Sequence, residues 1–139
     1  MVSKKVYIAS DGFMSFIDRV NKKHVQATAF FRYFAQEQYQ LYTNPLTVNE
    51  TYMNIYNTIS PSLARDFLRA LDLSGINIIS PENADIKAAI KIIETGNSVD
   101  LTFSKALMAV MCNKKSIPQI MTYEFLHALY GLQLFYLPV

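Results

Sequence analysis

The chain is poor in cysteine, in charge and in long apolar runs, and each shortage excludes a class of protein. Cys112 is the single cysteine among 139 residues, which excludes a disulfide framework or a thiolate metal cluster and favours a reducing, cytoplasmic compartment. Charged residues make up only 17% and are spread too evenly for a disordered chain. No apolar stretch approaches the ~20 residues that a membrane helix requires, so we expect no membrane segment.

What the chain does contain indicates one packed globular domain. Hydrophobic residues account for 51% of it, and nine Phe and nine Tyr are among them. A chain of this length is most simply a single domain, here residues 1–139, with one substantial core. The formal net charge of +2 neither requires nor excludes a nucleic-acid partner.

Short β-branched and aromatic runs alternate with helical patterns along the whole chain. Apolar residues at three- and four-residue spacing, caps and prolines predict helices over these ranges: 11–18 with Asp11 as cap, 24–38, 45–59, 61–72, 81–95, 101–111 and a short one from 124. Strands are expected over these: 6–8, 39–42, 76–79, 117–121 and 133–136. This alternation predicts an α/β fold with a mainly parallel central sheet that is covered by helices on both faces.

Lys105 is the only charge in the run 101–111. Apolar residues also occupy the helix face that it shares, which predicts a helix buried nearly all round. An unpaired buried ammonium costs several kcal/mol, so we expect Lys105 to contact the carboxylate of Glu50 or Glu124. Removing Lys105 from a buried pair would then cost about 3–5 kcal/mol. The alternative is that Lys105 reaches solvent along the helix and pairs with nothing.

Open parallel sheets place their functional groups at the carboxyl ends of the strands. Ala9 and Asp11 follow the first expected strand, Glu50 lies on the helix after the second, and Glu124 follows the fourth. Gathered carboxylates would suit a hard cation such as Mg²⁺, whereas Lys105 among them would oppose one.

Three stretches of the chain carry a more specific signal. They are Val6-Tyr-Ile-Ala-Ser-Asp-Gly-Phe-Met-Ser-Phe-Ile-Asp18, then Leu46-Thr-Val-Asn-Glu50, and then Leu101-Thr-Phe-Ser-Lys-Ala-Leu-Met-Ala-Val with Gln119-Ile-Met-Thr-Tyr-Glu124. In these stretches, and in their order, the chain resembles the PIN-domain nucleases, which include the VapC-type toxins of toxin–antitoxin pairs.

The resemblance implies a PIN-like three-layer α/β/α sandwich with a mainly parallel sheet. It also implies a cluster of acids that binds Mg²⁺ or Mn²⁺ and activates water to cut RNA. The matching positions hold Ala9, Glu50, Lys105 and Glu124. Ala9 stands at the vacated first Asp position, and Lys105 puts a positive charge where the cation would lie.

We therefore interpret the chain as a degenerate PIN-domain protein that binds RNA or protein, with metal-dependent nuclease activity lost or weak. One alternative is an active Mg²⁺- or Mn²⁺-dependent endoribonuclease, a VapC-like toxin, that uses Asp11, Glu50 and Glu124 as metal ligands. Another is a protein-interaction homodimer that binds an antitoxin-like chain. No cofactor is expected beyond Mg²⁺ or Mn²⁺ in the active case.

Other residues have both a functional and a structural interpretation. Asp11 and Asp100 are candidates for displaced metal ligands, although helix caps and loops are the commoner places for Asp. The aromatic residues beside Arg32 are candidates for stacking on RNA bases, although helical spacing favours a core: Phe30, Phe31, Tyr33 and Phe34. Basic pairs are candidates for the border of a phosphate groove: Lys4 with Lys5, and Arg19 with Lys22 and Lys23. His24 and His127 have no further zinc ligands at a suitable spacing, so we interpret both as structural.

Overall fold

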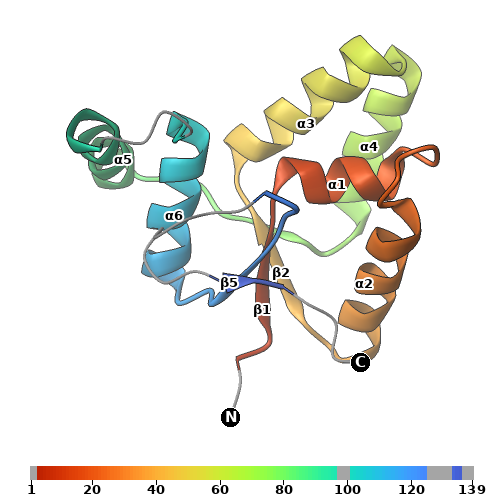
Figure 1. Cartoon of the computed structure of the whole chain (residues 1–139), viewed down its shortest axis with the longest axis horizontal. Helices are drawn as coiled ribbons and strands as arrows, with labels where there is room; N and C mark the ends of the chain where they lie inside the picture. The colour runs from red at the N-terminus through yellow and green to blue at the C-terminus, as the bar shows by residue number, and fades with distance from the viewer. Residues whose placement is uncertain (1–2, 97–100, 125–132, 136–139) are drawn as a thin grey trace.

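The computed structural model of the chain describes residues 3–96, 101–124 and 133–135. Its centre is a five-stranded sheet in which every pairing is parallel and the strand order is β3-β2-β1-β4-β5 (Figure 1). The strands are β1 (Lys5–Ile8), β2 (Gln40–Thr43), β3 (Asn77–Ile78), β4 (Gln119–Met121) and β5 (Gln133–Leu134). The predicted parallel α/β architecture is confirmed.

Helices cover both faces of the sheet and make three layers (Figure 1). One face carries α1 (Ser10–Ile17), α2 (His24–Gln36), α3 (Pro45–Thr58) and α4 (Pro61–Leu73). The other face carries α6 (Phe103–Lys115), and α5 (Asn83–Thr95) packs behind α6. The three-layer α/β/α sandwich expected from the sequence is therefore confirmed.

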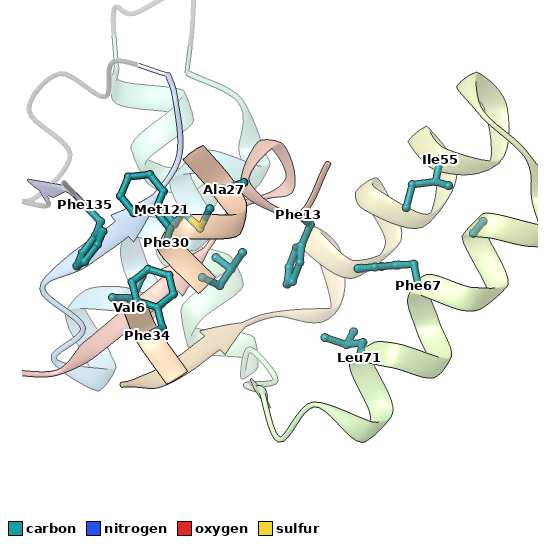
Figure 2. Packing of buried hydrophobic residues seen from close by; sticks show 12 residues of the cluster. Val6, Phe13, Ala27, Phe30, Phe34, Ile55, Phe67, Leu71, Met121 and Phe135 are labelled. Atoms are coloured by element: carbon teal, nitrogen blue, oxygen red, sulfur yellow. The ribbon is translucent and has the colours of Figure 1, made fainter. Parts of the chain in front are cut away.

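The side chains of β1 alternate between the two layers, as strand geometry requires. Val6 and Ile8 join the core beneath α1–α4, and Tyr7 points to the layer of α6. Figure 2 shows the larger core, in which Phe30 and Phe34 of α2 lie beside Phe135, with ring centroids 5.4 and 4.8 Å from it. These ring contacts pack α2 against the residue that follows the edge strand β5.

Capping residues set where the helices begin. Ser60 caps α4 by accepting a hydrogen bond from the backbone N–H of Leu63, as the Ser-Pro sequence predicted. A helix capped by Ser80 in the same way was also expected, and this prediction is wrong, because α5 begins at Asn83. Glu82 is the cap instead, and the carboxylate of Asp85 accepts from its backbone N–H at 2.8 Å.

Three of the observed strands, β3, β4 and β5, are shorter than the sequence suggested, with a physical cause at β4. Pro118 has no N–H to donate to a neighbouring strand, so β4 begins at Gln119 instead of at residue 117. β3 keeps two of its four expected residues, and β5 ends at Leu134 within the described ranges. The short helix expected from residue 124 lies outside the residues that the structure describes.

The middle of α6 is buried all round, as predicted. Its residues from Ala106 to Ala109 are all buried, and so are Met111 and Cys112. The prediction is wrong at the start of the helix, since Phe103 is 39% exposed, and the helix continues beyond the predicted range to the exposed Lys114 and Lys115. No helix in the described ranges is long and apolar enough to cross a membrane.

A carboxylate joins α5 to α6. Asp85 is buried, and Lys114 of α6 donates to its Oδ2 from 3.0 Å. The backbone N–H of Glu82, and then Lys114, hold the pKa of this carboxyl below its usual range. Because the folded pKa is lower than the unfolded pKa, the ionised form stabilises the fold above about pH 4, and this contribution is lost as the pH falls through the folded pKa.

We expect Asp85→Asn to lower the free energy of unfolding by about 1 kcal/mol at neutral pH, because it removes the charge and keeps an amide oxygen as acceptor. Urea unfolding at several pH values measures the difference between the two proteins, which should shrink as the pH falls below about 4. Asp66→Asn is the control, since Asp66 pairs with Arg69 on the exposed surface of α4. A difference for Asp85→Asn that does not depend on pH would contradict this account.

Gly12 lets α1 lie against the end of β4. A Cβ atom at this position would lie 2.8 Å from the backbone oxygen of Met121, which is too close for any side chain. The backbone N–H of Ala9 also donates to that oxygen, at 3.2 Å. The missing side chain of Gly12 therefore brings the start of α1 next to the residues that follow β4.

Gly12→Ala should destabilise the protein by about 1–3 kcal/mol, the usual cost of overpacking. Alanine favours a helix over glycine by up to ~1 kcal/mol, so the clash with a backbone oxygen outweighs the gain. Thermal and urea unfolding measure the change, with the exposed Gln26→Ala of α2 as a control expected to alter stability little. A Gly12→Ala protein as stable as the parent would show that α1 can move away from β4.

Candidate functional site

A cavity of about 230 Å³ lies at the carboxyl ends of β1, β2 and β4. Figure 1 shows α1 starting at this end of the sheet directly after β1. The charged residues that line the cavity are Asp11 of α1, Glu50 of α3, Lys105 of α6 and Glu124 after β4. Ala9 lines it as well, together with a set of hydroxyl side chains: Ser10, Thr47, Thr102, Ser104 and Thr122. The fold thus brings Asp11, Glu50, Lys105 and Glu124 to one cavity with Ala9, as predicted from the strand ends and the family resemblance.

Lys105 and Glu124 form an ion pair across this cavity. The Nζ atom of Lys105 lies 2.6 Å from Oε2 of Glu124, which confirms the expected contact with a carboxylate. The expected burial of the pair is wrong, because the two side chains are 27% and 53% exposed. The cavity opens to solvent at this point, so water still reaches both charged groups.

Glu50 is placed by contacts that fix α3 against β1. Asn44 caps α3 by accepting from the backbone N–H of Thr47, and the hydroxyls of Thr47 and Tyr7 lie 2.7 Å apart. Burial raises the pKa of the Tyr7 phenol well above its usual range, so this group stays a neutral hydrogen-bonding partner. One turn after Thr47, the carboxylate of Glu50 accepts a hydrogen bond from the hydroxyl of Ser104. Glu50 therefore links α3 to the first turn of α6.

Asp11 is held by the residues that follow β4. Its Oδ2 accepts from the hydroxyl of Thr122 at 2.6 Å and from the backbone N–H of Tyr123 at 2.8 Å. The prediction that Asp11 caps α1 is wrong, because Ala9 occupies the cap position and Asp11 lies in the first turn. The other oxygen, Oδ1, is buried and has no hydrogen-bond partner among the described residues. Asp11 joins the start of α1 to the segment that carries Glu124.

The described residues do not fit a metal centre of the expected kind. No group of three His, Cys, Asp or Glu side chains within the described ranges is placed to hold a metal ion. Each carboxylate of the cavity is bound by a protein donor instead, and Lys105 brings an ammonium group among them. Ala9 offers no side-chain oxygen at the first position. The roles of Asp11, Glu50 and Glu124 as metal ligands therefore stay predictions of the active-enzyme alternative.

Other candidate residues lie apart from the cavity. Phe30 and Phe34 are core residues, so the predicted base-stacking platform on α2 is wrong for both. Lys4 and Lys5 lie at the amino end of the sheet, where their ammonium groups donate to the backbone oxygens of Glu37 and Lys115. The His24 ring contacts the backbone oxygen of Ser15 at 3.1 Å, a structural role. Asp100 and His127 lie outside the described residues.

Sequence reasoning missed the hydroxyl groups that hold the carboxylates. Ser104 directly precedes Lys105, and Thr122 lies two residues before Glu124, yet neither has a pattern that marks it as a partner of Glu50 or Asp11. It also missed Tyr123, whose ring lies 5.6 Å from the ammonium of Lys23. These contacts join residues up to 112 positions apart, so they depend on strand order and leave no local signal.

Replacing Lys105 by methionine should lower the free energy of unfolding by no more than about 1 kcal/mol, because a partly exposed ion pair adds little to stability. The freed carboxylate of Glu124 is half exposed and stays solvated. Urea unfolding measures the difference between Lys105→Met and the parent. A loss of about 3 kcal/mol or more would mean that the pair is buried in solution.

Comparison with known proteins supports the fold. No protein-family model matches the chain, and no curated protein matches it in sequence. The solved structure of VapC20 from Mycobacterium tuberculosis, a toxin that cleaves the sarcin–ricin loop, is similar with a TM-score of 0.74. The similarity covers 89% of this chain and 92% of that one at 15% sequence identity. The chain therefore has the fold of the VapC-type PIN-domain proteins.

Proposed function

We propose that this chain is a PIN-like binding protein in which metal-dependent RNA cleavage is lost. The observation that carries the proposal is the ammonium of Lys105, 2.6 Å from Glu124 in the strand-end cavity. Metal-assisted hydrolysis needs cations that generate hydroxide and neutralise the charge of the transition state. An ammonium group cannot bind and activate a water as a metal ion does, and Ala9 supplies no ligand.

The partner that the surface supports best is a protein segment with an apolar face. A groove of about 560 Å³ lies between α1, α2 and α4, and its walls are mostly apolar. Its lining includes Phe13, Phe16, Phe31, Phe67, Leu71 and Ile76. Phe16 is 42% exposed there, and Arg19 and Asp66 supply charges of both signs beside it. Such a groove suits an amphipathic helix, which supports an antitoxin-like chain as the partner.

RNA is the second candidate partner, supported by the turn between α1 and α2. Arg19, Lys22 and Lys23 are exposed on this turn, and the Lys23 ammonium lies over the ring of Tyr123 next to the cavity. The cavity itself opposes a phosphate, because three carboxylates and one ammonium leave it a formal charge of −2. RNA would therefore contact the turn and Tyr123 at the rim of the cavity. The homodimer alternative stays a prediction, which sedimentation of the purified chain measures.

The loss of cleavage is tested with an RNA hairpin that has the sarcin–ricin sequence, the target in the name of VapC20. The purified chain should leave this RNA intact with Mg²⁺ or Mn²⁺ as well as with a chelator. Cleavage that requires Mn²⁺ and disappears in Glu50→Gln would overturn the proposal and favour the enzyme that uses Asp11, Glu50 and Glu124.

The partner is tested by placing a photo-crosslinking amino acid at position 16 in the full chain and irradiating it in a lysate of the source cells. A matched control carries the same group at position 93, because Ile93 is exposed on α5, away from the groove. A protein captured only at position 16 should bind the purified chain in calorimetry, and Phe16→Asp should weaken this binding about tenfold or more. Crosslinks to RNA at position 16, or equal capture at both positions, would contradict the protein-binding proposal.

A further inference from the structure

The three carboxylates of the strand-end cavity are each bound by a different donor of the protein. The hydroxyl of Thr122 and the N–H of Tyr123 bind Asp11, the hydroxyl of Ser104 binds Glu50, and the ammonium of Lys105 binds Glu124. Of these donors only Lys105 carries a full positive charge. It is also the only cation among the described residues that line the cavity.

We propose that the ammonium of Lys105 takes the place of a divalent cation in this cavity, so that it keeps metal ions away from the carboxylates of Glu50 and Glu124. This inference goes beyond the proposed function, because it concerns the binding of metal ions to the cavity when Lys105 is replaced. It requires no partner protein or RNA. It starts from the disagreement between the residues present and the metal centre that the fold implies.

Exclusion follows from the position and the charge of Lys105. A metal ion that used Glu124 as ligand would have to displace an ammonium that lies 2.6 Å from its carboxylate oxygen. If the ammonium stayed nearby, it would repel the ion, since like charges a few ångströms apart raise the energy even in a solvated site. The partial exposure of both side chains lets water enter, but it does not remove this competition.

Removal of Lys105 would free carboxylate oxygens for a cation. Glu124 would lose its ammonium partner and Glu50 would keep a neutral hydroxyl as partner, whereas Asp11 would stay bound by Thr122 and Tyr123. Carboxylate and hydroxyl oxygens are the ligands that Mg²⁺ and Mn²⁺ prefer. Three carboxylates without a cation repel one another, and a divalent ion relieves that repulsion.

The chain offers a matched control on the same helix. Lys114, in the last turn of α6, also has its ammonium in ion pairs, with Asp85 of α5 at 3.0 Å and with the capping residue Glu82 at 3.7 Å. Replacing either lysine by alanine removes one positive charge together with the ion pairs of that lysine. Lys114 is not among the residues that line the cavity, so the two variants separate a local effect from a change in net charge.

Mn²⁺ alone is the probe, and calorimetry together with the electron paramagnetic resonance signal of free Mn²⁺ measures its binding to the full chain. We expect Lys105→Ala to bind Mn²⁺ about tenfold or more tightly than the parent, whereas Lys114→Ala and Lys105→Arg bind like the parent. Glu50→Gln added to Lys105→Ala should abolish the gain, which assigns the ion to this cavity. Circular dichroism verifies that each variant folds, and Lys105→Met replaces Lys105→Ala if the alanine variant does not.

Three results would overturn the inference. The first is a parent protein that binds Mn²⁺ as tightly as Lys105→Ala. The second is a gain in Lys114→Ala equal to that in Lys105→Ala, which would indicate an effect of net charge. The third is a folded Lys105→Ala or Lys105→Met protein that binds Mn²⁺ no more tightly than the parent. None of these results depends on Phe16 or on the partner, so they leave the proposed protein-binding function to its own test.

Discussion

The ion pair between Lys105 and Glu124 connects the first turn of α6 to the segment that follows β4, and the chemistry of the strand-end cavity depends on it. Three carboxylates converge there because parallel strands end at the same edge of the sheet. Such a cluster needs positive charge from somewhere. In this chain a tethered ammonium provides it, which is the basis of our proposal that metal-dependent cleavage is lost.

The rest of the site depends on how closely α1 approaches β4. Gly12 permits that approach, and Asp11 then reaches Thr122 and the backbone of Tyr123. These bonds fix the segment from which Glu124 extends to Lys105. The carboxylate of Asp11 is therefore part of the framework that positions the ion pair, although it lies in the same cavity. Other residues of α1 form one wall of the apolar groove, so the strand-end cavity and the groove share this short helix.

Much of the architecture was predictable because its causes are local. The alternation of short strands with helices predicted the parallel sheet, and Ser60-Pro61 predicted the start of α4. The start of α5 was mispredicted because two caps compete within a few residues, and Glu82 with Asp85 makes the better-bonded one. The partnership of Lys105 with a carboxylate was predictable from charge and apolar context alone. The exposure of this ion pair was not predictable, because it depends on how far the strand-end cavity opens. The roles of Thr122 and Ser104 were not predictable either, because they depend on strand order.

The most direct test of the central claim is a crystal structure of the unmodified chain grown in excess Mn²⁺, with diffraction data that record the anomalous signal of manganese. The account predicts no manganese peak in the strand-end cavity and the ammonium of Lys105 in contact with Glu124. A manganese ion bound between Glu50 and Glu124, with Lys105 turned out to solvent, would contradict it.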